Sequence, residues 1–181
     1  MTLYRIYPAI RGAAPDEPGG ALFTATAGNG RIGNPDIYDE LYFADAAEGA
    51  IAETFGRLTD WHAGMLLRSG RRLALATYRF PDRAPLCDLD NPRELLRRRL
   101  HPSDVVSGDR KRSQAWARRI YDERTFAGIR WWSRLDSQWF IVGLWRIDLL
   151  EMSAEPEELA IDDPRLERTA RLISRRLANA R

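Results

Sequence analysis

Several residue types that build common functional sites are scarce in this 181-residue chain. Its single cysteine, Cys87, excludes an internal disulfide. Its two histidines, His62 and His101, stand in no H-E-x-x-H motif and no C-x-x-C spacing occurs, so the sequence predicts no metal site. No apolar run is long enough to span a membrane and no signal-peptide pattern is present. We therefore expect a cytoplasmic protein without a membrane partner.

Lysine is also scarce, because Lys111 is the only lysine among 28 basic residues. The arginines that replace it present forked donors that suit phosphate, but a formal net charge of +2 does not favour nucleic acid as a direct partner. Residues 36–60 contain seven acids and one arginine, whereas residues 93–124 contain ten bases and five acids. We interpret the basic region as solvated helix faces, with nucleic acid or an acidic protein partner as the alternative.

Hydrophobic periodicity predicts strands and helices in irregular alternation. Strands are expected at residues 3–7, 21–25, 40–45, 73–80, 128–133 and 138–148. Helices are expected at residues 45–58, 92–100 and 113–123, with Asp45 and Glu48 as the N-cap pair of the first.

The last part of the chain is expected to be an acidic connection at residues 151–163 and a C-terminal helix at 164–181. The apolar face of this helix comprises Leu166, Ala170, Ile173 and Leu177. With 44% hydrophobic residues and no internal repeat, residues 1–181 are expected to form one domain. The irregular alternation favours an α+β fold with small mixed or antiparallel sheets and flanking helices.

The stretch TATAGNGRIGNPD at residues 24–36 carries glycines at positions 28, 30 and 33, the G-x-G-x-x-G spacing of dinucleotide-binding loops. That motif works where a helix begins at the third glycine and directs N–H groups at a pyrophosphate. Here Asn34 and Pro35 follow at once, and the residue before a proline is disfavoured in the helical region. The spacing therefore does not predict a Rossmann fold, and it leaves a glycine loop centred on Arg31.

Polar residues of several predicted elements remain as a candidate constellation. They are Arg5, Arg31, Tyr42, Glu53 and Ser133. The serine lies in RWWSRL and not in the G-x-S-x-G motif of a nucleophile elbow, so a serine hydrolase is not predicted.

Taken in order, the segments LYRI, GNGRIGNP, LYFADAAEGAIAETF and FAGIRWWSR resemble the successive blocks of the RES domain, a family named for an arginine, a glutamate and a serine. The resemblance covers about the first 60 residues and residues 126–146. It implies a fold similar to that of ADP-ribosyltransferase toxins and an activity that destroys NAD⁺ by cleaving its nicotinamide–ribose bond. It also implies a toxin paired with an Xre-type antitoxin protein.

The resemblance assigns roles to individual residues. It implies catalytic roles for Arg31, Glu53 and Ser133, which match the arginine, glutamate and serine of the family. Arg5 and Tyr42 match flanking positions and are implied to bind substrate, together with Arg31, Ser133 and the nearby Asn34.

One departure from the family pattern lies in the glycine loop. The family commonly has Gly-Arg-aromatic-Asn, whereas Ile32 and Gly33 separate Arg31 from Asn34 in this chain. An aromatic wall of the site is therefore expected to be missing.

The implied chemistry needs few catalytic groups. Nicotinamide is a cation in NAD⁺ and departs neutral, so one carboxylate that stabilises the developing charge on the ribose is sufficient, where ordinary glycosidases need two. Glu53 fits this role, because a helix places it beside Ala46, Gly49 and Ala50, whose small side chains let a ligand approach.

The other residues are expected to hold NAD⁺, which is the substrate, so no cofactor is expected. Arg5 and Arg31 are candidates to clamp the pyrophosphate through charge-assisted hydrogen bonds. Tyr42 offers a flat face for nicotinamide, and Ser133 a small hydroxyl for the amide or the ribose. The sequence leaves the acceptor open between water, inorganic phosphate as a co-substrate, and a protein that would be ADP-ribosylated. A non-catalytic interaction module is the alternative from another class.

Overall fold

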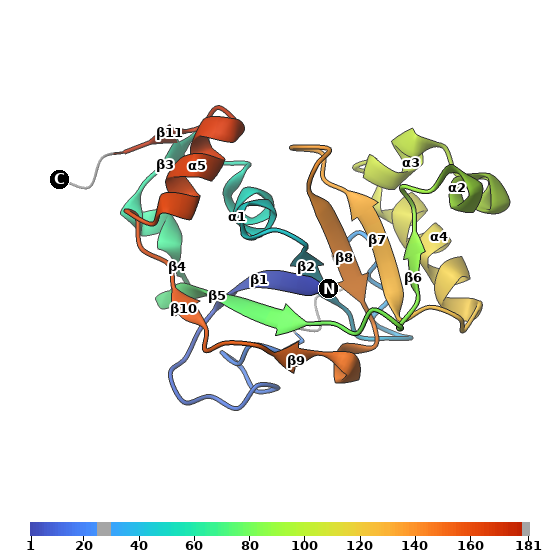
Figure 1. Ribbon diagram of the computed structural model, residues 1–181, viewed down its shortest axis with the longest axis horizontal. Coiled ribbons are helices and arrows are strands. Elements are labelled where there is room, and N and C mark those ends of the chain that lie inside the picture. The colour runs from blue at the N-terminus through green and yellow to red at the C-terminus, as the bar shows by residue number, and fades with distance from the viewer. Residues whose placement is uncertain (25–29, 179–181) are drawn as a thin grey trace.

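The structure, a computed structural model, describes residues 1–24 and 30–178, and its centre is a nine-stranded mixed sheet (Figure 1). The strands follow one another in the order β10-β5-β1-β2-β8-β7-β6, and β4 and β9 also pair with β5. All these pairs are antiparallel except β6 and β7. The strands are β1 Thr2–Pro8, β2 Leu41–Ala44, β4 Leu67–Arg68, β5 Arg71–Arg79, β6 Leu86–Asp88, β7 Gly128–Trp132, β8 Phe140–Leu144, β9 Glu151–Met152 and β10 Glu157–Glu158.

A second, two-stranded sheet and several helices complete the fold. The strands β3 Asp60–Trp61 and β11 Arg176–Leu177 pair in parallel. The α-helices are α1 Ala47–Phe55, α2 Pro92–Arg98, α3 Pro102–Val106, α4 Arg110–Asp122 and α5 Pro164–Leu172, and the 3₁₀ helices are η1 Ala63–Leu66 and η2 Ile147–Leu149. Within the described part of the chain, no helix has the length and apolar character needed to cross a membrane.

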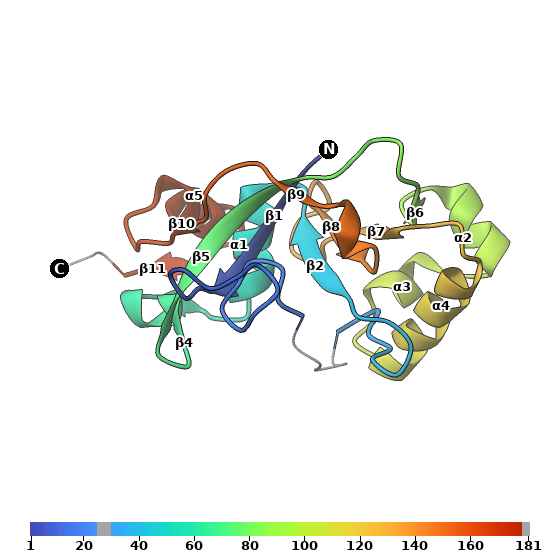
Figure 2. The ribbon, with the colours of Figure 1, turned by 90° about the horizontal axis from the view of Figure 1, so that it is seen from below.

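The helices gather at two ends of the sheet. Figures 1 and 2 show α1 and α5 together at one end, and α2, α3 and α4 together at the other. Buried hydrophobic clusters lie on both faces of the sheet, since successive side chains of a strand point to opposite faces. On β2, for example, Leu41 and Phe43 enter one core cluster, whereas Tyr42 and Ala44 face the other cluster, which packs against the helices.

The predicted α+β fold with a mixed sheet and flanking helices is confirmed, and the sheet is larger than expected. The acidic connection at 151–163 is one reason, because it contributes β9 and β10 to the edge of β5. Two-residue strands of this kind carry too little periodicity to be found from sequence. The basic helix predicted at 113–123 begins earlier, at Arg110, because the Asp109 side chain accepts a hydrogen bond from the N–H of Arg112 and caps it.

The predicted N-cap of α1 is wrong. Ala46 is the N-cap residue and makes no side-chain cap hydrogen bond. Asp45 instead continues the pairing of β2 with β8, since its N–H donates to the carbonyl of Phe140 and its carboxylate accepts from the N–H of Phe140, both at 3.0 Å. The pairing of two strands thus outweighs a local capping preference.

Two further predictions of secondary structure need correction. Residues 21–24 form turn and coil instead of a strand, and residue 25 lies outside the described residues. The C-terminal helix α5 ends at Leu172, well before residue 181, because the chain turns to place β11 beside β3. Leu166 and Ala170 of its predicted apolar face are buried, whereas Ile173 and Leu177 lie beyond the helix and pack partly against the core.

The contact between β7 and β8 depends on a glycine, which generates a test of the fold. A Cβ atom on Gly128 would lie 2.3 Å from the backbone oxygen of Gly143. We expect Gly128→Ala to lower the free energy of unfolding by about 1–3 kcal/mol, since two central strands must separate. Gly108→Ala is the control, because a Cβ there meets no atom within 4 Å. Urea unfolding curves that coincide for the two variants would contradict this account of the sheet.

Candidate functional site

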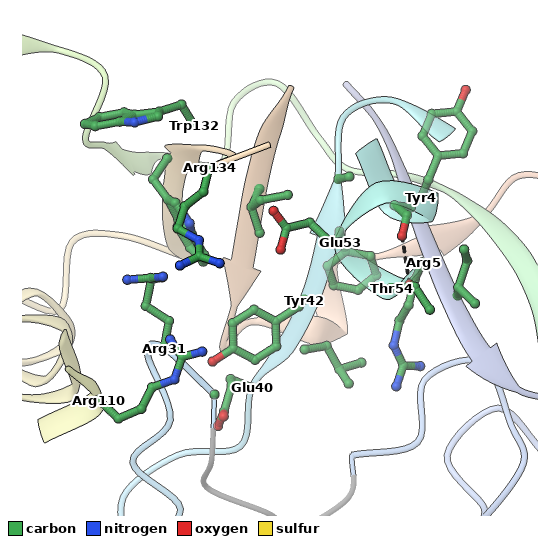
Figure 3. Close-up of a pocket in the computed structure, with 18 of the residues that line it drawn as sticks. Tyr4, Arg5, Arg31, Glu40, Tyr42, Glu53, Thr54, Arg110, Trp132 and Arg134 are labelled. Atoms are coloured by element: carbon green, nitrogen blue, oxygen red, sulfur yellow. Dashed lines mark hydrogen bonds between the residues drawn. The ribbon is translucent and has the colours of Figure 1, made fainter. Parts of the chain in front are cut away.

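A cavity of about 480 Å³ opens where α1 passes over the sheet and where the start of α4 meets the loop at residues 30–34 (Figure 3). It brings together residues of β1, β2, β7 and β8 with residues of both helices. Arg5, Arg31, Tyr42 and Glu53 of the predicted constellation line it. The lining also includes Tyr4, Glu40, Ala50, Thr54, Arg68, Arg110, Trp131, Trp132 and Arg134.

Glu53 projects from α1 into this cavity, and Ser133 holds its carboxylate. The Ser133 hydroxyl donates to Oε1 of Glu53 at 2.6 Å and accepts from the N–H of Leu135 at 3.0 Å. Ser133 is 3% exposed and lies behind the cavity wall, so its contact with the cavity runs through Glu53. A carboxylate fixed on one oxygen keeps the lone pairs of the other oxygen for a ligand.

The small residues beside Glu53 serve two different purposes. Ala50 lines the cavity as predicted. Gly49 faces the protein interior instead, where a Cβ would lie 3.2 Å from the side chains of Ala44 and Trp139. The absence of a side chain at Gly49 therefore lets α1 approach the sheet, while Ala50 leaves space for a ligand.

Tyr42 forms the floor between Glu53 and the glycine loop (Figure 3). Its hydroxyl accepts a hydrogen bond from the N–H of Ile32 at 3.0 Å, and its ring meets Trp131 edge-on. Burial raises the pKa of the phenol, so Tyr42 is neutral at physiological pH. The loop passes so close that a Cβ on Gly30 would lie 1.9 Å from the hydroxyl oxygen, which explains the glycine at that position.

Arg31 lines the cavity, but the hydrogen bonds of its side chain within the described residues go to backbone carbonyls. Its Nη1 donates to the carbonyls of Val105 and Ser107 at 2.7 and 2.6 Å, at the C-terminal end of α3. Burial lowers the pKa of this guanidinium to about 10, and repulsion by Arg110 and Arg134 adds to the shift. Arg31 therefore ties the glycine loop to the basic helices.

Arg5 is engaged in the same way on the other side of the cavity. Its two terminal nitrogens donate to the carbonyls of Ala21 and Phe23 at 2.5 and 3.0 Å, and burial lowers its pKa. The pair of arginines predicted to clamp a pyrophosphate is thus separated by Tyr42 and Glu53, as Figure 3 shows. Each of the two stabilises a neighbouring segment of chain.

Asn34, like Ser133, is a predicted site residue that lies outside the cavity lining. Its amide donates to the carbonyl of Ile32, the hydroxyl of Tyr38 and the carbonyl of Gln114, at 2.8–3.2 Å. These bonds fold the loop back on itself and fasten it to α4. The contact with α4 spans 80 residues of sequence, so local spacing could not reveal it.

Sequence reasoning missed Arg110 and Arg134, which lie with Arg31 on one side of the cavity (Figure 3). Both belong to stretches that had been interpreted as solvated surface or as motif flanks. The arginine-rich composition was the available signal, but it could not distinguish these two from the rest. Many other arginines of the basic region are neutralised by nearby carboxylates, in the pairs Arg98 with Glu94 and Glu123, Arg112 with Asp104, and Arg118 with Asp122.

The described lining carries five arginines and two glutamates, a formal balance of +3. This charge favours an anionic ligand. In residues 1–24 and 30–178, no group of three metal-ligating side chains is placed to hold a metal ion.

The hydrogen bonds of Arg31 predict that this residue stabilises the fold even when no ligand is bound. We expect Arg31→Ala to lower the free energy of unfolding by about 1–3 kcal/mol without any ligand, because charged hydrogen bonds to the end of α3 are lost. Arg31→Lys recovers only part, since an ammonium cannot reproduce the fork. Arg134→Ala is the control, as no hydrogen bond of Arg134 is found in the described residues. Equal thermal midpoints for wild type and Arg31→Ala would contradict the assignment.

Comparisons with known proteins identify the family of this chain and a solved structure of similar fold. A family model of the RES domain matches residues 2–176, nearly the whole chain. A chain in the crystal structure of the M. tuberculosis MbcT-MbcA toxin-antitoxin complex superimposes with a TM-score of 0.66, covering 96% of this chain and 88% of that chain at 18% identity. A search of curated protein sequences finds no significant match. Because one family model spans almost all of the sequence, this chain belongs to the RES domain family.

Proposed function

We propose that this protein cleaves the nicotinamide–ribose bond of NAD⁺, with Glu53 as the catalytic carboxylate. The observation that carries the proposal is the Glu53 carboxylate, held by Ser133 at 2.6 Å and facing a cluster of arginines across a cavity. A dinucleotide offers the matching features, a ribose that becomes cationic and a diphosphate that is anionic. The RES domain resemblance supports the same chemistry.

The step requires stabilisation of positive charge more than proton transfer. As the bond to nicotinamide breaks, charge develops on the ribose, and a fixed carboxylate stabilises it more in the transition state than in the ground state. Ser133 contributes by orienting Glu53, because a carboxylate already in place needs no rearrangement during the reaction. Tyr42 and Trp131 offer flat apolar walls for nicotinamide. No cofactor enters this scheme.

The acceptor that takes the ADP-ribosyl group defines the reaction class. Water yields ADP-ribose, inorganic phosphate yields ADP-ribose 1″-phosphate, and a protein acceptor retains the label of labelled NAD⁺. Product analysis with and without added phosphate therefore distinguishes a glycohydrolase, a phosphorylase and an ADP-ribosyltransferase.

We further propose that the protein is a toxin restrained by an antitoxin partner. The matched solved structure is a toxin-antitoxin complex, and the family resemblance implies a partner of Xre type. Unchecked loss of NAD⁺ harms a cell, so a partner that covers the cavity fits this chemistry. The internal ion pairs of α2 and α4 do not favour nucleic acid as a direct partner, because they neutralise much of the basic region.

The catalytic assignment is tested by Glu53→Gln, which keeps the shape of the side chain and removes its charge. We expect nicotinamide release to fall at least ~100-fold, as when one electrostatic stabiliser is removed, with NAD⁺ affinity nearly unchanged. Glu48→Gln on the same helix is the matched control, because Glu48 pairs with Arg168 and lies outside the cavity lining. Turnover of Glu53→Gln within a few-fold of wild type would refute the assignment. Loss of activity with a chelator, restored by a divalent ion, would refute the metal-free scheme.

The toxin proposal is tested in growing cells. Expression of the wild type is expected to slow growth and deplete NAD⁺, whereas Glu53→Gln at equal expression does neither. Growth and extracted NAD⁺ are measured on the same cultures, with Glu48→Gln as the control that retains toxicity. Equal growth with wild type and Glu53→Gln would argue against a toxin that acts by this chemistry.

A further inference from the structure

The structure raises the question of which side chains meet the diphosphate of a dinucleotide. Both terminal nitrogens of Arg5 donate to the carbonyls of residues 21 and 23, whereas Nη1 of Arg31 donates to those of residues 105 and 107 and its Nη2 to that of residue 106, at 3.5 Å. A ligand that recruited them would have to replace those bonds and release the segments that they hold. Cations of the same cavity that make no such bonds are better placed to bind an anion.

Arg110 is one such cation. It is the first residue of α4 and lines the cavity, yet its Nη1 is buried and has no hydrogen-bond partner in the described part of the chain. A buried cationic donor without a partner is costly, and buried donors in folded proteins are nearly always satisfied. Its proximity to Arg31 increases that cost, because the two charges repel. An anion in the cavity would meet the part of this guanidinium that lines it and cancel part of the repulsion.

Arg134 is the second. It follows Ser133 directly, so the same turn that fixes Glu53 also sets the place of Arg134. No hydrogen bond or ion pair of Arg134 is found among residues 1–24 and 30–178. Figure 3 shows Arg134, Arg110 and Arg31 grouped on one side of the cavity, with Glu53 facing them.

We propose that Arg110 and Arg134 bind the diphosphate of the dinucleotide, and that Arg31 stands behind them as the residue that positions α3 and the glycine loop. The inference rests on the proposed function for the identity of the ligand. Two guanidinium groups match the two negative charges of a diphosphate and can each donate two hydrogen bonds to its oxygens. The N-terminal end of the 13-residue helix α4 adds a favourable dipole on the same side.

This placement also orients the substrate. With the diphosphate on the Arg110 side, the ribose that is attacked reaches Glu53, and nicotinamide lies beside Tyr42 (Figure 3). Because the diphosphate is remote from the bond that breaks, its contacts stabilise ground state and transition state alike. Their loss is therefore expected to raise KM more than it lowers kcat.

The test compares ADP-ribose, which carries the diphosphate and the second ribose, with adenosine, which carries neither, by calorimetry on the full chain. We expect Arg110→Gln and Arg134→Gln each to weaken ADP-ribose about 10- to 100-fold, the scale of hydrogen bonds between charged groups, and to leave adenosine unchanged. Lys111→Gln is the matched control, since it removes the same charge from the exposed neighbour of Arg110. Thermal midpoints should stay equal to or above wild type, because neither arginine has a hydrogen bond to lose.

The outcomes separate this inference from the proposed function. Wild-type affinity for ADP-ribose in both arginine variants, or an equal loss in Lys111→Gln, overturns the inference even if the wild type cleaves NAD⁺. Conversely, an arginine-dependent preference for ADP-ribose over adenosine in a protein that releases no nicotinamide supports the inference and refutes the proposed function. A KM increase confined to Arg110→Gln and Arg134→Gln supports both.

Discussion

The hydrogen bond from Ser133 to Glu53 is the contact on which the organisation of the site depends. It joins residues 80 positions apart, and the sheet makes it possible. Strands β2 and β7 both pair antiparallel with β8, so they run parallel to each other and end at the same edge of the sheet. The chain enters α1 soon after β2 ends, and Ser133 directly follows β7. The helix therefore places Glu53 within hydrogen-bonding distance of Ser133. Any shift in the β2-β8-β7 register would separate the two side chains.

The sequence predicted the place of a residue where that place follows from the helix or strand to which the residue belongs. The strand pattern, the helix of Glu53 and the order of motifs predicted that Tyr42, Glu53 and Ser133 belong together, and the structure places them together. The hydrogen-bond partner of each hydroxyl and guanidinium could not be predicted, because the partners are distant in sequence. Arg31 bonds to carbonyls more than 70 residues away, and the role of Arg110 depends on a donor that lacks a partner. Neither feature leaves a trace in composition or periodicity.

The departure from the family pattern in the glycine loop has a structural compensation. Ile32, which with Gly33 occupies the place of the expected aromatic residue, is fully buried, and it packs over the bare backbone of Gly143. Its N–H is bound by the Tyr42 hydroxyl and its carbonyl accepts from the Tyr38 hydroxyl. The side chain therefore anchors the loop in the core instead of forming a wall of the cavity. Flat surfaces for a ligand come from Tyr42 on β2 and Trp131 on β7, the two strands that flank β8.

The arrangement of charge around the cavity is unfavourable, and an anionic ligand offsets it. Arg110 and Arg134 both repel Arg31, and the partial burial of Arg31 limits the screening of its charge by solvent. The backbone carbonyls that bind Arg31 offset part of this repulsion, but they hold only one of the three cations. Because Arg31 is held in place, binding of an anion beside it converts repulsion into attraction without moving that residue. The same preorganisation places Glu53 opposite the cations, so an anionic ligand long enough to cross the cavity meets the carboxylate at its far end.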